Sequence, residues 1–575
     1  MKKFPFLALV VSFFVISCGG GDGEHTLHVL TTNDVHGKWF DSAYVTGGGK
    51  PSLMDIDLYV DSIRNEVGAE NVLLIDAGDC LQGDNASYYY NYVRTDVPHL
   101  FPRLVSYMGY DAICVGNHDI ETGHPVYDKV KKELSDLGIP FLAGNAIDTE
   151  TGKQYFDYYK TFRKASMKIL VIGYTNANIK AWLNESLWQG MRFDSLLPLV
   201  QEDVDRLRKK EKPDVVIVAA HTGVGEGDGT VLESQAMDLF NSLNGVDILV
   251  ASHDHRAKVE SKDGMVMVNA GSNGYNIGHS VLTIKKEKGK EVSREVGASL
   301  IYVDGKKENT EMIEAFREEF EEVKSFTLQE VGELKSDLST SESFVGMSPY
   351  MNFLHTVCLM QEPAEISIAA PLNQNQTIKA GTLLYNDMFA LYKYENQLFV
   401  VEMTGEEIRL FLENSYDIWI NTIPSGHLLK IHSEEDRSGK MIWSFDNPSY
   451  NFDSAAGINY TVDVTKPFGE RVNISTLADG DPFELDHTYN VAMTSYRASG
   501  GGATMVKAGI DTDNIDGRVV AKYPEIRDLI YDYIKGNGVL DPAELDDPAV
   551  LGHWSFVPEP LVKPLLERDY KLLFE

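Results

Sequence analysis

The sequence predicts a two-domain protein in which a layered α/β domain precedes a mixed α+β domain. Short apolar runs, each ending in polar residues, recur between residue 26 and about residue 285 and alternate with helical patterns. This alternation is typical of a sheet that is covered by helices on both faces. The chain has 575 residues, which is too long for one hydrophobic core, because single cores stop growing at roughly 250–300 residues.

Eight runs are expected to form buried strands, because they are rich in Val, Ile and Leu without strict alternation. They are 26–34, 71–79, 110–119, 139–145, 167–177, 214–223, 246–255 and 265–272. Helical periodicity between them predicts helices over 55–68 and 196–211. These elements place the first domain at 26–305.

Charged helical residues follow the first domain, and we expect connecting helices over 306–363. Strand and helix patterns then alternate in stretches such as NQLFVVEMTGEEIRLFLE and HTYNVAMTSY, so 364–575 is expected to form the C-terminal α+β domain. Because helices rather than a Pro/Gly linker join the two domains, the connection indicates a defined hinge.

The composition restricts the possible partners. The net charge is −34 and no basic stripe is present, which argues against a duplex nucleic-acid binder, since such proteins cluster Lys and Arg against phosphates. A small nucleotide held by metal ions remains compatible with this charge. Beyond Cys18 the three cysteines are Cys80, Cys114 and Cys358, without a CxxC motif. They do not form a disulfide scaffold, and whether any two of them pair is open.

The first residues, MKKFPFLALVVSFFVISCGGGDGE, combine a basic start with a short apolar segment, which is typical of a secretory signal. Val15-Ile16-Ser17-Cys18 resembles a bacterial lipobox, in which the cysteine is lipidated. We therefore expect a lipoprotein signal peptide over 1–17 and a flexible tether over 18–25. The protein would be exported and lipid-anchored to a bacterial membrane, facing the periplasm or the cell surface. The alternative is an ordinary signal peptide that contains a cysteine.

Potential metal ligands follow five of the predicted strands. They are Asp34 and His36 in TNDVHG, Asp79 in DAGD, Asn117 and His118 in GNHD, His221 in AAHTG, and His253 and His255 in ASHDH. The carboxyl ends of strands in an α/β sheet line one crevice, so these side chains are expected to converge. Carboxylates, imidazoles and an amide suit Zn, Mn, Fe or Co. The set is too large for one ion and would suit two ions bridged by a carboxylate, about 3.5–4 Å apart.

Each of these residues also has an ordinary explanation. An Asp or Asn after a strand is usually a turn or cap residue, and a single His is more often structural than a ligand. The joint occurrence of five such clusters at strand ends of one domain favours the metal site.

In this order, TNDVHG, DAGDCLQGDN, GNHDIE, AAHTG and ASHDH resemble the motifs of the calcineurin-like metallophosphoesterase family. The signal segment and TSYRASGGG narrow the resemblance to the bacterial 5'-nucleotidase / 2',3'-cyclic-nucleotide 2'-phosphodiesterase family. It covers nearly the whole mature chain. The resemblance implies a layered β-sandwich flanked by helices, followed by a C-terminal nucleotide-binding domain of the 5'-nucleotidase type.

The resemblance also implies roles for individual residues. One ion would be held by Asp34, His36, Asp79 and His255, and the other by Asp79, Asn117, His221 and His253, with Asp79 bridging. His118 would face the leaving-group oxygen, and Glu121 would orient it at a position where Asp is common. Asp119 would be a turn or supporting residue. Water would attack phosphorus in line without a covalent intermediate.

In this family two aromatic rings of the second domain enclose the base. TSYRASGGG resembles the loop that carries one of them, which assigns that role to Tyr496, and PSYNFDSAAG resembles the other, which assigns it to Tyr450 with Phe452 as second choice. The alternative is that these rings belong to the core. Stacking of one base on an aromatic ring contributes roughly 1–3 kcal/mol.

Two departures bear on the substrate. The Asn-x-Gly-Gly-x-Arg stretch of typical 5'-nucleotidases is missing, since the corresponding place reads SIAAPLNQNQTIKAG, and the last metal motif ends in His255 where Gln is frequent. Both favour a 2',3'-cyclic-nucleotide 2'-phosphodiesterase / 3'-nucleotidase in nucleotide catabolism and salvage. A 5'-nucleotidase or nucleotide-sugar hydrolase is the alternative. A non-catalytic surface binding lipoprotein and a di-manganese hydrolase of sulfur compounds are further alternatives, and Tyr496 argues against the latter. No obligate protein partner is expected.

Overall fold

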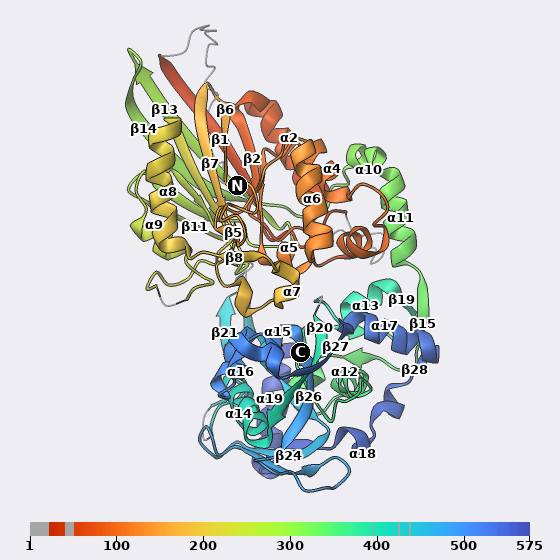
Figure 1. The fold of residues 1–575 in the computed structure, drawn as a ribbon. Coiled ribbons are helices and arrows are strands. Elements are labelled where there is room, and N and C mark those ends of the chain that lie inside the picture. Colours follow the sequence, from red (N-terminus) through yellow and green to blue (C-terminus); the bar gives the residue numbers. More distant parts are fainter. Residues whose placement is uncertain (1–21, 41–50, 230, 395, 424–425, 436–438) are drawn as a thin grey trace, which may run out of the picture.

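The structure is a computed structural model that describes residues 22–575 except 41–50, 230, 395, 424–425 and 436–438. The predicted signal peptide over 1–17 and Cys18 therefore lie outside the described residues. Two domains follow one another along the chain, with the first above the second in Figure 1. No helix in the described part is both long and apolar enough to cross a membrane.

Two six-stranded sheets form the centre of the first domain. One has the order β14 (Lys290–Tyr302), β13 (Asn276–Glu287), β1 (Gly23–Thr32), β2 (Val72–Asp76), β3 (Ala112–Cys114) and β4 (Phe141–Leu142). The other has the order β11 (Lys258–Lys262), β12 (Met265–Asn269), β10 (Ile248–Val250), β9 (Val215–Ala220), β7 (Met167–Tyr174) and β6 (Tyr159–Lys164). In the first sheet the antiparallel hairpin β13–β14 extends a parallel part that ends at β4, whereas in the second sheet antiparallel strands flank a parallel middle on both sides.

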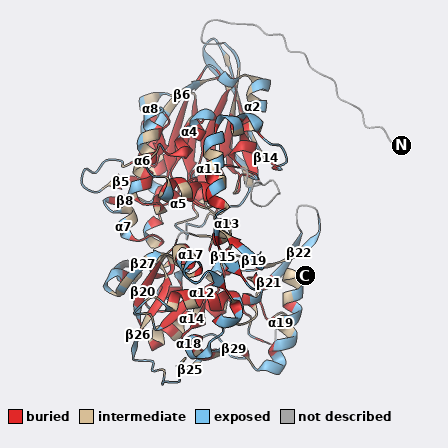
Figure 2. Cartoon of the chain, turned by 90° about the vertical axis from the view of Figure 1, so that its right-hand side faces the viewer, coloured by how far each residue is buried: buried red, intermediate tan, exposed pale blue. Residues whose placement is uncertain are grey.

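The core explains why the sheets stack. Leu27 and Val29 of β1 pack between the sheets against Ile169 and Val171 of β7, whereas Leu30 of β1 faces the helices. Those outer helices are α2 (Leu53–Val67), α4 (Leu100–Tyr107) and α6 (His124–Asp136) on one side, and α8 (Leu196–Glu211) and α9 (Ala236–Ser242) on the other. Figure 2 shows the strands buried beneath helices whose outer faces are exposed. The layered β-sandwich flanked by helices is confirmed.

Several predicted boundaries need correction. Each of the eight apolar runs contains a strand, but the strands end earlier than predicted, so the polar residues lie in the loops beyond them. The long hairpin β13–β14 was not predicted, because its exposed stretch KKEKGKEVSRE lacks an apolar run. The tether over 18–25 is too long, because residues 23–25 already pair with β13 as the start of β1.

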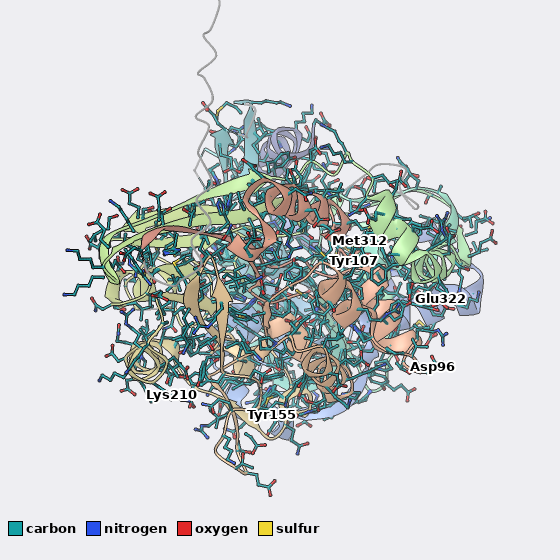
Figure 3. The ribbon with its side chains drawn as sticks, turned by 90° about the horizontal axis from the view of Figure 1, so that it is seen from above. Asp96, Tyr107, Tyr155, Lys210, Met312 and Glu322 are labelled. Atoms are coloured by element: carbon teal, nitrogen blue, oxygen red, sulfur yellow. The ribbon has the colours of Figure 1, made fainter. Side chains whose placement is uncertain are left out.

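The predicted connecting helices over 306–363 are correct only in part. Helices α10 (Thr310–Ala315) and α11 (Arg317–Thr327) link the domains and add Met312 and Phe316 to the core of the first domain. The ring of Phe316 lies 5.3 Å from that of Tyr107 at the end of α4; Figure 3 labels Tyr107 and Met312 in this region.

The rest of the predicted connector belongs to the second domain. Strand β15 (Glu330–Leu334) pairs with β19 (Gly381–Leu384) and with β28 (Val539–Leu540). Helix α12 (Pro349–Leu359) is buried in the second core. In the sequence this helix looks like a linker because the strands that cover it come later in the chain.

A five-stranded mixed sheet organises the second domain, in the order β23 (Ser454–Ala456), β17 (Ile366–Ala369), β26 (Thr488–Thr494), β20 (Gln397–Thr404) and β27 (Val519–Glu525). Alternate residues of β20 enter different cores. Val400 packs toward α12 and α17 (Ile526–Asn537), and Phe399 packs toward α14 (Gly405–Trp419). The predicted α+β class holds for this domain.

Candidate metal centre and substrate cavity

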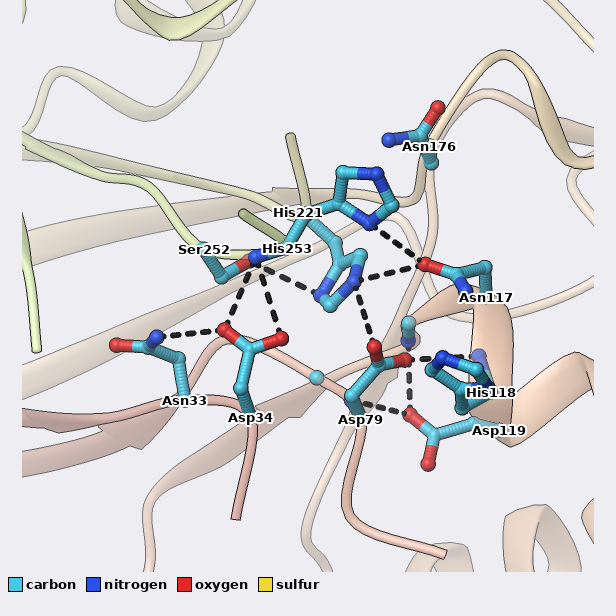
Figure 4. Close-up of polar contacts among 12 residues, drawn as sticks. Asn33, Asp34, Asp79, Asn117, His118, Asp119, Asn176, His221, Ser252 and His253 are labelled. Carbon is cyan, nitrogen blue, oxygen red and sulfur yellow. Dashed lines mark hydrogen bonds and ion pairs between the residues drawn. The ribbon is translucent and has the colours of Figure 1, made fainter. Parts of the chain in front are cut away.

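The loops after five strands bring all seven predicted metal ligands to one end of the β-sandwich. The first sheet supplies Asp34 and His36 after β1, Asp79 after β2, and Asn117 after β3; the second supplies His221 after β9, and His253 and His255 after β10. Figure 4 shows most of this cluster, with the strands entering from the two sheets. The ligands therefore meet at the joint edge of two sheets rather than in the crevice of one.

Five of these ligands have an unusual backbone. The φ angles are 50° at Asp34, 50° at His36, 62° at Asp79, 75° at His253 and 60° at His255. A side chain in this left-handed region costs of order 1–3 kcal/mol and persists only where the surroundings enforce it. The clustering of such residues at one place is typical of a functional site.

Asp34, His36 and His255 form the first potential ligand group. The Nε2 atoms of His36 and His255 lie 2.8 Å apart, and His255 Nε2 lies 3.7 Å from Asp34 Oδ1. Asp34 is fully buried, and its Oδ2 accepts a hydrogen bond of 2.9 Å from the backbone N–H of His253. This bond ties the end of the first sheet to the second.

Asp79, His221 and His253 form the second potential ligand group. Asp79 Oδ2 lies 3.1 Å from His221 Nε2, and the Asn117 side-chain oxygen lies 2.9 Å from His253 Nδ1 and 3.1 Å from His221 Nε2. The backbone carbonyl of Ala77, 2.8 Å from His221 Nδ1, can only accept a hydrogen bond. Nδ1 therefore carries the proton, which leaves Nε2 to face the cluster as a ligand atom.

The site fits divalent metal ions. Asp79 Oδ2 is buried and accepts no hydrogen bond from any described residue, an arrangement that is costly unless a cation satisfies the oxygen. The Nε2 atoms of His36 and His255 face one another, as they would if both coordinated the same metal ion. A mixed set of imidazoles, carboxylates and an amide oxygen suits Zn, Mn, Fe or Co and does not distinguish among them.

The pKa values of the buried ligand candidates shift in different directions: against the effect of burial, the Asp79 carboxylate raises the pKa of His221 to about 10. Burial raises the pKa of Asp34 to about 8, and the Asp79 carboxylate adds to this shift. Burial lowers the pKa of His253 to about 3 and that of His255 to about 4. Bound cations would favour the ionised carboxylates and the neutral imidazoles, because these are the forms that coordinate metal ions.

Asp119 of the GNHD motif supports the surrounding backbone. The carboxylate of Asp119 accepts four backbone N–H bonds of 2.8–3.0 Å, from Gly116, Asp79, Cys80 and Leu81. Asp119 is therefore the supporting residue that was predicted, and it fixes the loop that carries Asp79.

The ring of His118 is held by Glu121, three residues later in helix α5 (Asn117–Glu121). Its Nδ1 lies 2.5 Å from Glu121 Oε2, and Gln82 Nε2 donates a hydrogen bond of 3.1 Å to the same oxygen. Glu121 thus reaches His118 despite its extra methylene.

A cavity of about 540 Å³ lies between the metal-ligand cluster and the second domain, and residues of both line it. Tyr450 and Tyr496, the two predicted base-stacking residues, are among them. Phe452, the second choice for this role, is instead fully buried and stacks on Trp419 at 5.4 Å. Tyr450 lies only two residues away in PSYNFDSAAG, so only tertiary packing separates the cavity ring from the core ring.

Arg497 fastens the two tyrosine loops together, a role that the sequence did not reveal. Its guanidinium is buried and donates hydrogen bonds to the backbone carbonyl of Tyr450 (2.8 Å), to the Asn451 side chain (3.0 Å) and to the carbonyl of Gly501 (2.7 Å). It also lies 2.9 Å from the Asp453 carboxylate.

The glycine run after Tyr496 has a packing reason as well. A Cβ at Gly501 would lie 2.5 Å from ring atoms of Tyr496, so only glycine lets this ring lie flat on the loop.

Three further cavity residues escaped the sequence analysis: Trp182, Lys393 and Tyr394. The ring of Tyr394 lies parallel to that of His118, with centroids 6.4 Å apart and planes at 7°. Trp182 stacks on the metal-ligand candidate His253 at 5.1 Å. In the sequence YKYEN two tyrosines flank Lys393, and this pattern could have pointed to a binding site. Nothing nearby in the sequence, however, places these residues opposite the metal cluster.

Comparison with known proteins agrees with this geometry. Residues 27–257 match the model of the calcineurin-like phosphoesterases, and residues 329–508 match the model of the 5'-nucleotidase C-terminal domain. The chain contains a calcineurin-like phosphoesterase domain. The two matches cover the two domains that the structure separates, and the start of the second match at residue 329 agrees with β15 as the first strand of the C-terminal domain.

Several relatives share this pair of domains at low identity. A 2',3'-cyclic-nucleotide 2'-phosphodiesterase/3'-nucleotidase of Salmonella typhimurium is 23% identical, covering 83% of this chain and 81% of the relative. A 5'-nucleotidase of Vibrio vulnificus is 23% identical, covering 88% and 91%. The trifunctional nucleotide phosphoesterase protein YfkN of Bacillus subtilis is 23% identical over 92% of this chain, which spans only 39% of that protein.

Among solved structures, a Staphylococcus aureus protein assigned as a 5'-nucleotidase superposes with a TM-score of 0.77 at 20% identity, covering 92% of this chain and 99% of that one. At this identity the likeness concerns the fold. Together the matches make the chain a metal-dependent phosphoester hydrolase, while the substrate has to be argued from the cavity.

The geometry of the calcineurin-like phosphoesterase domain suggests a chemical role for several of its own residues. Bound divalent ions would supply Lewis acidity and a low pKa for a coordinated water molecule. His118, oriented by Glu121, faces the cavity from the same loop as Asn117 and can donate a proton to a departing alkoxide. General-acid help of this kind contributes typically 10²–10⁴-fold. Asp119 and Gln82 keep the loop and the Glu121 carboxylate in place.

We expect Asp79→Asn to reduce kcat for bis-p-nitrophenyl phosphate to less than about a tenth of the wild-type value. The variant loses the carboxylate that would bridge the two metal ions, and with it several kcal/mol of transition-state stabilisation. Steady-state kinetics with added Mn, Co or Zn, together with metal analysis, would measure this. Asp96→Asn is the control, since it removes an exposed carboxylate of the same domain that pairs with Arg94. Retention of more than a tenth of kcat would contradict the two-metal assignment.

His118→Ala should keep both metal ions and lose turnover by roughly 10²–10⁴-fold, because the general acid is lost and the ligands are not. Glu121→Gln should show a smaller loss of the same kind. Metal analysis and kcat are measured on the same samples. His124→Ala is the matched control, because His124 also bonds a carboxylate, that of Asp128 at 3.0 Å, outside the cavity. An empty metal site in His118→Ala would make His118 a ligand instead.

Proposed function

We propose that this protein hydrolyses nucleotides as a 2',3'-cyclic-nucleotide 2'-phosphodiesterase / 3'-nucleotidase. One observation carries the proposal: a single cavity joins the candidate metal centre to tyrosine rings of the second domain. Metal ions would hold the phosphoryl group, and the rings would hold the base. The names of several relatives are consistent with this substrate class.

The aromatic part of the cavity supports the choice of a base over a smaller alcohol. Tyr394, Tyr450 and Tyr496 all line this one cavity, and burial raises the pKa of Tyr496. Aromatic stacking contributes roughly 1–3 kcal/mol per base and tolerates every base. We therefore expect broad base tolerance.

Two features support a cyclic rather than a 5'-nucleotide. The chain after β17 reads APLNQNQ and presents Ala370 and Leu372 to the cavity, without the arginine found there in typical 5'-nucleotidases. His255 completes the first ligand group where Gln is frequent in those enzymes. Hydrolysis of 5'-nucleotides is the second candidate, in keeping with the Vibrio vulnificus relative.

A substrate panel distinguishes these candidates. We expect the highest kcat/KM on 2',3'-cyclic and 3'-nucleotides, a lower value on 5'-nucleotides, and loss of all activity with a chelator, restored by one of Mn, Co, Zn or Fe. A clear preference for 5'-nucleotides would transfer the proposal to 5'-nucleotidase. Absence of any metal-dependent turnover would instead support a binding lipoprotein.

Tyr496→Ala should raise KM for a 2',3'-cyclic nucleotide by one to two orders of magnitude, given roughly 1–3 kcal/mol of stacking. KM for bis-p-nitrophenyl phosphate should change little if that ester needs only the metals. Phe468→Ala serves as control, because Phe468 is an aromatic residue of the same domain that is 50% exposed and lies outside the cavity. Equal losses on both substrates would make Tyr496 structural.

We also propose that the protein is exported and anchored by a lipid on Cys18, on the strength of the sequence motif alone. Cys18→Ser should leave the exported protein unlipidated and in the soluble fraction, because the thiol is the acylation site. Membrane fractionation and mass spectrometry of the N-terminal peptide test this. A Cys18→Ser variant that still partitions with membranes would refute the lipid anchor.

A further inference from the structure

Three cationic side chains line the cavity among the described residues, namely Arg256, Lys393 and Arg497, and they differ in how they are paired. Arg497 already donates hydrogen bonds to the two tyrosine loops and pairs with Asp453. The side chain of Arg256 is 67% exposed and lies 3.9 Å from the Asp254 carboxylate. Only Lys393 combines partial burial with the absence of any pairing carboxylate among the described residues.

The surroundings of Lys393 hold its backbone but leave its ammonium unengaged. The buried guanidinium of Arg527 donates hydrogen bonds to the carbonyl of Tyr392 (3.0 Å) and to that of Lys393 (2.9 Å). The ammonium lies 5.3 Å from the centre of the Tyr394 ring, and no carboxylate of the described residues pairs with it. Lys38 provides a contrast, because it pairs closely with Asp84.

Lys393 lines the same cavity as the metal-ligand candidates His36 and His255. Burial is the main cause of the lowered pKa of His255, and the positive charge of Lys393 is among the neighbours that lower it further. The same charge acts on His36. Lys393 thus reaches from the second domain toward the first ligand group.

An unpaired, partly buried cation costs free energy unless an anion satisfies it. The chain had many acidic residues available, since it carries 86 Asp and Glu against 52 Lys and Arg. Among the described cavity residues, the cation without a carboxylate partner therefore points to an anion that arrives from solution. The candidate anion is the phosphoryl group, because the cavity leads to the metal ligands that would hold it.

We propose that Lys393 binds the phosphoryl group of the substrate from the second domain and selects for the doubly charged phosphomonoester over the singly charged cyclic diester. The inference rests on the proposed nucleotide function. It adds that Lys393 contributes differently to the two hydrolysis steps. In the first step, water adds to phosphorus, the P–O2' bond breaks, and O2' takes a proton.

The first step changes the charge of the substrate. The cyclic diester carries one negative charge, and the 3'-monoester carries about −1.5 to −2 near neutral pH after losing a proton to solvent. The attraction to an ammonium grows with the charge of the phosphoryl group. Lys393 therefore contributes more to hydrolysis of the monoester in the second step.

The test follows product formation from 2',3'-cyclic AMP by the metal-loaded full chain. Lys393→Gln should lower kcat/KM for 3'-AMP by roughly 10- to 100-fold, as expected for a lost hydrogen bond to a charged group. The loss on the cyclic substrate should be several-fold smaller, so 3'-AMP should accumulate during the reaction. Lys393→Arg should restore most of the monoester activity, and Lys393→Met keeps the apolar stem should Lys393→Gln fold poorly.

A binding measurement supplies a second readout. In calorimetric titrations with inorganic phosphate, Lys393→Gln should bind about tenfold or more weakly than wild type, while competitive inhibition by adenosine should stay unchanged. Lys379→Gln is the control, because Lys379 belongs to the same domain, is 76% exposed and pairs with Asp337.

Equal losses on the cyclic and the monoester substrate, or an unchanged phosphate affinity, would overturn the role of Lys393. A wild-type protein that hydrolyses no nucleotide would overturn the proposed function instead, and the phosphate titration would still decide whether Lys393 binds the anion.

Discussion

The Asp79 carboxylate, buried where the two sheets meet, is the interaction on which the site depends. Its Oδ1 accepts the backbone N–H of His118 at 2.8 Å, and its Oδ2 faces His221 of the other sheet. The fit is tight, since a Cβ at Gly116 would lie 2.0 Å from Oδ1. Both sheets must therefore end within a few ångströms of one another, which fixes their stacking and the short loops that follow them.

This convergence requires a polar network inside an otherwise apolar domain. Asn33, which follows β1, bonds to Asn269 and to the backbone of Ala270 and Gly271 beyond β12 of the other sheet. Asp119 satisfies four backbone donors around the Asp79 loop. Such fully satisfied networks make a buried polar region tolerable and fix one geometry. They also hold the ligands in the left-handed backbone conformations that would otherwise relax.

The second domain turns this general phosphoester site into a selective one. Its sheet is buried on both faces, so the loops at its edge have a rigid base. Arg497 ties the Tyr450 and Tyr496 loops to each other, and Arg527 fixes the backbone at Lys393. Two buried guanidiniums thus position the tyrosine loops and the backbone of Lys393 at the cavity. Stacking and charge recognition then come from one domain, and the candidate metal ligands from the other.

The sequence by itself determined the two-domain class, the approximate positions of eight strands of the first domain and the seven candidate metal ligands. Buried parallel strands need continuous apolar runs, and metal ligands need particular side chains directly after them, so both leave local patterns. Glu121 and Tyr496 could also be identified from the sequence, because the motifs that contain them, GNHDIE and TSYRASGGG, are short and continuous.

Tertiary structure decided what depends on residues far apart in the chain. It placed 330–363 in the second domain because the partner strands β19 and β28 come later. It separated Tyr450 from Phe452, since only packing against Trp419 makes one of two neighbouring rings a core residue. It also revealed Lys393, Tyr394 and Arg497 in one cavity. Burial and charge pairing are properties of the assembled chain, and no local pattern records them.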